Sequence, residues 1–193
     1  MYLDPANLEA RSRALLAAGD DRAAATMVLR ELGPQVVRYL RSVLRHEDDA
    51  AEAFSSFAED LWRGLPAFRW EAPLRSWVFR VAWHAALAVR NDAFRRHGRR
   101  LETGEASALA AEIHTTAARV ELQRRALGAL RDALSPEEQS LLALRVDQQL
   151  PWEEVAVVLT GEADARSVAA LRKRFERLKE RIARLARERG VLE

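Results

Sequence analysis

The chain has 193 residues, a formal net charge of +2 and no cysteine, which excludes disulfides, thiolate metal ligands and thiol nucleophiles. The longest uncharged stretch in the middle of the chain, 81–89, is far too short to cross a membrane. The N-terminus lacks the basic region and the apolar run of a signal peptide, so we expect a soluble cytoplasmic protein without membrane insertion.

Helical periodicity dominates the N-terminal half. Cap and turn residues predict its first boundaries: Asp4-Pro5 begins a helix, Gly19-Asp20 ends it, and Gly33-Pro34 separates a second helix from a third. A fourth helix covers 50–62, and a loop at 67–73 leads into a long helix that begins at Leu74. No segment alternates with period two, so we expect no sheet.

The C-terminal half predicts a second helical unit. Residues 98–116 have weak periodicity and predict a linker between two domains, 1–97 and 117–193. Ser135-Pro136-Glu137-Glu138 predicts a capping box with proline in the first helical turn. A short helix from Trp152, a turn near Gly161 and a long final helix then predict a helix-turn-helix. The fold class is therefore all-α.

Charge is distributed in blocks. Residues 47–60 contain six acidic side chains and no basic one, whereas 75–100 contain seven basic side chains against Asp92 alone. In 166–189, ten basic side chains face three acidic ones. Two basic blocks and one acidic block suggest two contacts with anionic partners and one contact with a partner that is not DNA. The alternative is three ordinary solvated helix faces.

The final helix has one continuous apolar stripe from Val168 to Leu185, which leaves its other faces free for contacts. Arginine there suits both guanine edges and phosphates, although a helical hairpin with a solvated basic face would have the same pattern. We expect the duplex-DNA contacts at Arg166, Ala169, Arg172, Lys173, Arg174 and Arg177.

Two tryptophans of the long helix have different surroundings. Trp77 shares an apolar stripe with Leu74 and Val81 and is expected in the core. Trp83 has Arg80 and Arg90 as helical neighbours, which is the combination of aromatic surface and positive charge that unstacked bases require. The alternative is that Trp83 covers a seam between helices.

Two groups of segments carry a resemblance to a known family. The first group is Arg38-Tyr39-Leu40-Arg41, Asp49-Ala50, Leu61-Trp62-Arg63-Gly64-Leu65-Pro66-Ala67-Phe68-Arg69 and Leu74-Arg75-Ser76-Trp77-Val78-Phe79-Arg80-Val81-Ala82. The second group is Leu134-Ser135-Pro136-Glu137, Trp152-Glu153-Glu154-Val155-Ala156 and the final basic helix. The first group resembles domain two, and the second resembles domain four, of the small two-domain extracytoplasmic-function group of bacterial RNA polymerase sigma factors. The resemblance spans about residues 17–187.

The resemblance implies a factor that binds core RNA polymerase, recognises the −10 and −35 promoter elements and assists promoter opening. Domain two would bind a coiled coil of the largest polymerase subunit through Asp49, Glu52, Ser55, Ser56, Glu59 and Trp62. The −10 strand would meet Arg75, Arg80, Trp83, His84, Asn91, Arg95 and Arg96. Domain four would bind the −35 duplex and meet the polymerase flap. Family likeness also allows an anti-sigma factor as a partner, although no residue identifies one.

Three departures from the family pattern set limits on these assignments. Ser55-Ser56 stands where relatives carry Gln-Glu or Gln-Asp, which bears on the strength of core binding. His84 stands where relatives often have asparagine, which bears on the preferred −10 sequence. The turn from Thr160 to Arg166 is longer than usual, so the start of the recognition helix is fixed only to within one residue.

Two other functional classes compete with this interpretation. The four histidines are scattered, no glycine-rich phosphate loop is present, and we therefore expect no enzyme activity, no metal and no cofactor. A DNA-binding transcriptional regulator that does not join polymerase is the second rival, and the Ser55-Ser56 departure is what favours it.

Overall fold

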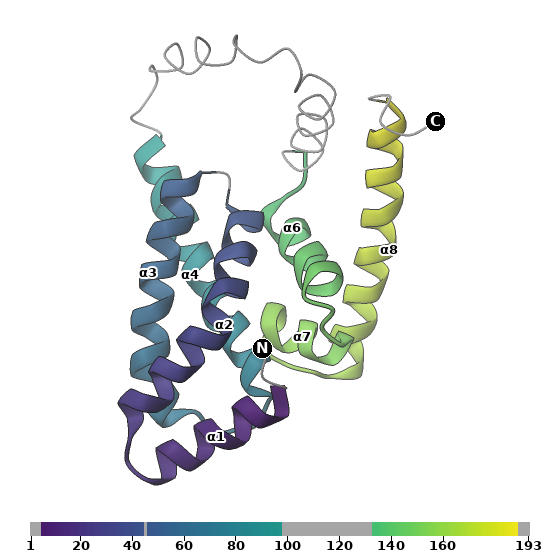
Figure 1. Cartoon of the computed structure of the whole chain (residues 1–193). Helices are drawn as coiled ribbons and strands as arrows, with labels where there is room; N and C mark the ends of the chain where they lie inside the picture. Colours follow the sequence, from purple (N-terminus) through teal and green to yellow (C-terminus); the bar gives the residue numbers. More distant parts are fainter. Residues whose placement is uncertain (1–4, 45, 98–132, 189–193) are drawn as a thin grey trace, which may run out of the picture.

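The computed structural model describes the backbone at residues 5–44, 46–97 and 133–188, and side chains at 7–44, 46–91 and 133–188. Within these ranges the chain is helical and contains no strand, as predicted (Figure 1). The elements are α1 (Pro5–Ala17), α2 (Asp21–Val43), α3 (Glu47–Gly64), η1 (Leu65–Ala67), α4 (Leu74–His97), α6 (Pro136–Leu142), η3 (Ala143–Asp147), α7 (Trp152–Thr160) and α8 (Ala165–Glu188). The predicted linker at 98–116 lies outside the described residues.

Helix α2 is continuous, so the predicted break at Gly33-Pro34 is wrong. Pro34 lies inside the helix on an exposed position. An interior proline removes one backbone hydrogen bond and costs about 3 kcal/mol in an isolated helix. Here the residues on both sides of Pro34 share one buried face, which runs from Ala24 to Val43. Burial of that whole face offsets the cost and keeps the helix unbroken.

The N-terminal helices form a bundle in which α3 packs against α4 and α2, and α1 packs against α2. Phe57 and Leu61 of α3 and Val78 and Phe79 of α4 are fully buried in it. Tyr39 of α2 meets the Phe79 ring edge to face at 5.4 Å between centroids. This apolar packing fixes which faces of α3 and α4 remain available for partners.

The remaining helices, α6, η3, α7 and α8, are called the C-terminal helices below. They do not stand apart from the bundle: α6 and η3 contact α2, α7 contacts α4, and α8 contacts α6 and α7 (Figure 1). The buried apolar side chains of the bundle and of the C-terminal helices accordingly form one cluster, which includes Leu8 of α1 and Leu178 of α8. Division into two domains remains a prediction, but the described parts pack against each other.

The capping box at the start of α6 is confirmed. The Ser135 hydroxyl accepts from the amide of Glu138 at 3.2 Å, and the Glu138 carboxylate accepts from the amide of Ser135 at 2.8 Å. Arg181 of α8 donates to the same carboxylate at 2.9 and 3.0 Å and to the carbonyl of Ala133 at 2.7 Å. This cap therefore also holds α8 against α6.

We expect Ser135→Ala to lower the free energy of unfolding by about 1 kcal/mol, because the substitution removes the side-chain acceptor of the cap. Urea denaturation followed by circular dichroism measures the change. Ser135→Asp is the matched control, since aspartate caps equally well. Equal stability of the alanine and aspartate variants would contradict the prediction.

Candidate functional site

One face of α4 is directed toward the C-terminal helices. This face, the α4 stripe, consists of Ser76, Arg80, Trp83, Leu87 and Arg90. Residues spaced alternately by four and three positions lie above one another on a helix. Trp83, at the centre of the stripe, is only 5% exposed.

Three side chains of the α4 stripe bond to the C-terminal helices. The Ser76 hydroxyl donates to the carboxylate of Glu154 on α7. The Arg80 Nη1 donates to the carbonyl of Gly161 at 3.5 Å. At the other end of the stripe, Arg90 Nη1 donates to Glu137 Oε1 of α6 at 3.1 Å. Trp83 lies between these contacts, so it covers a seam between helices, which was the alternative to an exposed stacking surface.

Arg75 lies beside the stripe and joins the two halves of the chain. Its Nη2 donates to Gln35 Oε1 of α2 at 3.1 Å, and to the carbonyl and the side-chain oxygen of Gln148 at 3.0 and 3.1 Å. Both glutamines are buried. The guanidinium also lies over the Phe79 ring at 5.7 Å. These contacts join α2, α4 and the segment after η3 through one guanidinium group.

The carboxylate of Glu137 supplies negative charge to the same interface. Its partial burial acts to raise the pKa, but the hydrogen bonds from its own amide, from Ser135 and from Arg90, together with the charge of Arg90, lower the pKa overall. Glu137 therefore stays ionised at neutral pH, where it pairs with Arg90.

The predicted −10 residues fall into three groups. Arg75, Arg80 and Trp83 face the C-terminal helices, as described above. His84 and Asn91 are exposed on the neighbouring face of α4. The side chains of Arg95 and Arg96 lie outside the described residues, although α4 extends past them to His97. The chain thus presents only part of the predicted set to solvent.

The loop before α4 is held in place by aromatic rings and by α1. The Phe68 ring stacks on Trp77 and tilts against Trp70, each at 4.8 Å between centroids. The Arg13 guanidinium of α1 lies 4.6 Å from the Trp70 ring centroid, and Glu9 of α1 accepts from the first amide of α4 at 3.0 Å. Trp70 has φ 59, a left-handed conformation that bulky residues rarely adopt. These contacts hold that conformation.

The outer face of α3 carries the residues predicted to bind core polymerase. Trp62 is 43% exposed, which is unusual for a large aromatic side chain. Arg63 is 3.6 Å from Glu59 and 3.2 Å from Asp60, so part of the acidic block is paired within the helix. The predicted set lies on one side of α3 and is exposed except at Asp49, which is half-buried: Asp49, Glu52, Ser55, Ser56, Glu59 and Trp62.

A tight turn joins α7 to α8 and fixes where α8 begins. Gly161 has φ 89, a left-handed conformation that glycine adopts without strain. Asp164 then caps α8: one carboxylate oxygen accepts from the amides of Arg166 and Ser167 at 2.8 and 2.9 Å, and the other accepts from the Ser167 hydroxyl at 2.7 Å. The hydrogen bonds from Ser167 and Arg166 lower the pKa of Asp164. The helix therefore starts at Ala165, a point that the sequence left open by one residue.

Helix α8 packs its apolar stripe inward and presents basic residues to solvent. The Trp152 and Phe175 rings meet edge to face at 5.4 Å and hold α7 against α8. Arg172 is 3.9 Å from Glu153 and 5.9 Å from the Trp152 ring, so part of its charge is balanced locally. All six predicted duplex contacts are exposed: Arg166, Ala169, Arg172, Lys173, Arg174 and Arg177.

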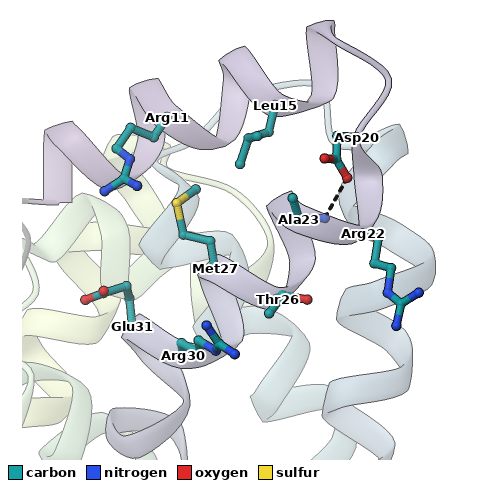
Figure 2. Close-up of a pocket in the computed structure, with 9 residues that line it drawn as sticks. All are labelled: Arg11, Leu15, Asp20, Arg22, Ala23, Thr26, Met27, Arg30 and Glu31. Atoms are coloured by element: carbon teal, nitrogen blue, oxygen red, sulfur yellow. Dashed lines mark hydrogen bonds between the residues drawn. The ribbon is translucent and has the colours of Figure 1, made fainter.

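An open pocket of about 630 Å³ lies between α1 and α2 (Figure 2). Its charges are mixed, and Asp20 caps α2 by accepting from the amide of Ala23 at 3.0 Å. The lining consists of Arg11, Leu15, Asp20, Arg22, Ala23, Thr26, Met27, Arg30 and Glu31. No set of catalytic groups converges there.

The described residues contain no cluster of three or more histidine, aspartate or glutamate side chains that would suit a metal ion. None of their helices combines the length and the hydrophobicity that crossing a membrane requires. The features that stand out are the three helix surfaces on α3, α4 and α8.

Two of these three surfaces lie within a segment that is similar to a known family. Residues 28–100 match the family model of Sigma-70 region 2. Region 2 covers less than half of the chain and includes most of α2, all of α3 and all of α4. The match supports a sigma-70 factor that binds polymerase and acts in promoter recognition. No match to a curated protein was found.

Region 2 contains all the predicted core and −10 residues, whereas α8 lies outside the match. What the sequence did not predict is the set of partners that cover the α4 stripe. Glu137 and Glu154 stand in the first turns of α6 and α7, where acidic residues are common because they complement the helix dipole. Because this local role already explains both residues, the sequence offered no reason to expect their contacts with Arg90 and Ser76 of α4.

Proposed function

We propose that the chain is a sigma factor of the extracytoplasmic-function group, which binds core RNA polymerase, recognises −10 and −35 elements and assists promoter opening. The observation that carries the proposal is the match of residues 28–100 to Sigma-70 region 2 in a chain that also presents an exposed basic helix after a tight turn. The protein acts by recognition and strand opening and has no chemistry of its own. Such a factor works in the cytoplasm, where polymerase is found.

The outer face of α3 is the proposed contact with the coiled coil of the largest polymerase subunit. Exposed tryptophan and depletion of basic charge both suit a protein partner better than DNA. Trp62 would supply buried apolar area in the complex, and the acidic residues would supply electrostatic complementarity.

The −10 strand is assigned to α4 and to the loop before it. Capturing a base outside the stack costs a few kcal/mol, which the protein must offset with stacking and with phosphate contacts. The α4 stripe has the required groups, since Trp83 and Arg80 both belong to it and Arg75 lies beside its first turn. His84 and Asn91 are placed on the adjoining exposed face.

The −35 duplex is assigned to α8 as the second helix of a helix-turn-helix. In such motifs the first residues of the second helix enter the major groove. With α8 beginning at Ala165, these are Arg166 and Ala169, followed by Arg172 and Lys173 one turn later. Arg174 and Arg177 are on faces suited to phosphates. The rest of the C-terminal helices would meet the polymerase flap.

Gel filtration of the purified full chain with core RNA polymerase from a closely related bacterium tests the proposal. We expect a stable stoichiometric complex that initiates at specific promoters in run-off transcription. A chain that is folded by circular dichroism yet elutes apart from core polymerase would contradict it.

Ser55 and Ser56 favour a second candidate, a sigma-like DNA-binding regulator that does not join polymerase. Both serines are exposed in the middle of α3, where short hydroxyl side chains offer less contact than the longer residues of relatives. This regulator would bind duplex operator DNA alone, which the sigma factor would do poorly. An anti-sigma factor remains a proposed partner of the sigma factor only.

Neutralising Arg95 and Arg96 together should weaken promoter binding by the holoenzyme and flatten its dependence on salt. Affinity falls as salt rises, and each lost phosphate contact makes the slope of log affinity against log salt less steep by about 0.9 in duplex DNA and about 0.7 in a single strand. Fluorescence anisotropy over a salt series measures this slope. Neutralising Arg22 and Arg30 is the matched control, because these exposed arginines lie on α2 beside the pocket. An unchanged slope for the Arg95 and Arg96 variant would argue against phosphate contact.

A further inference from the structure

The loop before α4 presents two charged side chains to solvent on either side of one anchored ring. Arg69 and Glu71 are exposed, and neither side chain forms a hydrogen bond or an ion pair within the described part of the chain. Between them, the half-buried Trp70 ring lies against Phe68 and close to Arg13 of α1. Arginine can bond to guanine edges and glutamate to cytosine edges, so the loop offers two groups able to distinguish bases.

Helix α1 anchors this loop, although it lies before the segment that matches Sigma-70 region 2. It crosses the end of the bundle at which α4 begins (Figure 1). We propose that Glu9 and Arg13 of α1 are positioning residues for the 68–73 loop. They hold its backbone so that Arg69 and Glu71 set which bases of the −10 element are preferred. The identity of the DNA rests on the proposed function, whereas the hold of α1 on the loop does not.

The carboxylate of Glu9 makes two contacts at once. Its Oε2 accepts from the backbone amide of Leu74 at 3.0 Å, and its Oε1 accepts from the Arg13 Nη2 at 2.8 Å. The first amides of a helix have no partner inside the helix, and the helix dipole favours negative charge there. Glu9 therefore fixes both the end of the loop and the direction of the Arg13 guanidinium.

Arg13 extends this support to the middle of the loop. Its guanidinium carbon lies 4.6 Å from the centroid of the Trp70 ring, within the range of a cation–π interaction. Trp70 has φ 59, and a bulky residue keeps such a conformation only where its surroundings hold it. A change of φ at one residue redirects the chain on both sides of it. The contact at Trp70 therefore governs the directions of Arg69 and Glu71.

The Trp70 ring also has a rigid support on the bundle. Phe68 lies against it and stacks on Trp77 of α4, with 4.8 Å between ring centroids in each pair. Leu8 and Ser12 are buried, so α1 is itself anchored to the bundle. The loop is thus held between two fixed helices.

Discrimination between bases depends on how firmly the reading groups are held. The contacts of arginine with guanine and of glutamate with cytosine require a defined direction. A loop that moves freely loses this direction but keeps its charge, so the choice among sequences changes more than the total affinity for DNA, to which phosphate contacts contribute. The property that α1 controls is therefore −10 specificity.

Hydrogen exchange in the free full chain is the first test, because the Leu74 amide donates directly to Glu9. We expect Glu9→Ala to speed exchange of this amide by about tenfold or more, since a hydrogen bond to a charged acceptor is lost. Glu9→Gln keeps an acceptor oxygen and should speed exchange less. Glu31→Ala is the control, because it removes a carboxylate from α2 beside the pocket. An unchanged Leu74 exchange rate in Glu9→Ala overturns the hold of α1 on the loop.

Promoter selectivity of the holoenzyme is the second test. Selection from a library with a randomised −10 element gives the preferred sequence, and single-base variants of it give a discrimination ratio at each position. We expect Arg13→Gln to lower this ratio about fivefold at the positions read by the loop, which is the upper end for an exposed cation–π contact. Discrimination at the −35 element should not change. Arg13→Lys keeps a positive charge near the ring and should restore most of the ratio.

Arg11→Gln is the matched control, since Arg11 is an exposed arginine of the same helix that lines the pocket between α1 and α2 (Figure 2). Its discrimination ratios should equal those of the wild type. If Arg13→Gln instead weakens binding to every −10 sequence equally, Arg13 is not a positioning residue.

The two tests separate this inference from the proposed function. Failure to co-elute with core polymerase counts against the sigma-factor function, while the Leu74 exchange rate in the free chain still decides whether α1 holds the loop. Exchange that responds to Glu9→Ala in a chain that does not join polymerase would overturn the role in −10 specificity and leave a structural contact.

Discussion

Replacing Trp62 with alanine should weaken association with core RNA polymerase by about 30-fold or more, which corresponds to about 2 kcal/mol. A tryptophan that is 43% exposed in the free chain has apolar area left to bury in a complex. Tryptophan is also the residue type in which binding energy at interfaces is most often concentrated. Titration of labelled chain with core polymerase measures the change.

The Trp62 experiment has a control at the same position. Trp62→Phe keeps an aromatic ring of smaller area, so its affinity should fall between those of the wild type and the alanine variant. The fold should survive both changes, because much of the side chain already faces solvent, and circular dichroism verifies this. If Trp62→Ala binds core polymerase as tightly as the wild type, the outer face of α3 is not the interface.

The second large effect is expected at Trp83, which is 5% exposed. Trp83→Ala should lower the free energy of unfolding by about 3–5 kcal/mol, since it leaves a large cavity between α4 and the C-terminal helices. Urea denaturation measures this loss. Trp83→Phe should lose less, because the phenyl ring fills part of the same space.

Trp83 should also matter for promoter opening. In the holoenzyme we expect Trp83→Ala to impair open-complex formation more than core binding, because under the proposed function the indole ring stacks on unpaired bases. Reactivity of unpaired thymines to permanganate measures opening, and co-elution measures core binding. Equal loss of both functions would mean that Trp83 serves packing alone.

Local sequence patterns predicted the individual helices well, except where packing overrode them. α3, α4, α7 and α8 each have a continuous apolar face, and the capping box of α6 has a strict residue pattern. Pro34 was interpreted as a break because its local cost is high, yet the buried face of α2 continues past it. The π-helical turn η3 has no comparable sequence signal.

The sequence identified the residues of the α4 stripe but not their surroundings. Spacing alone placed Arg80, Trp83 and Arg90 on one face and left Trp83 as either a stacking surface or a seam. In the structure Trp83 lies at the seam between α4 and the C-terminal helices. The contacts on either side of it, Arg90 with Glu137 and Arg80 with Gly161, join residues 47 and 81 positions apart. Such long-range pairs leave no trace in helical periodicity, so no local pattern would have revealed them.

Helix α1 has a practical consequence for the choice of fragments. It lies before the Sigma-70 region 2 match, yet its Glu9 and Arg13 hold the loop and the first turn of α4 in place. A recombinant piece cut at the borders of the match would lose the support for the left-handed conformation of Trp70. DNA measurements on such a piece would report a loosened loop, so a faithful minimal fragment must begin at or before Pro5.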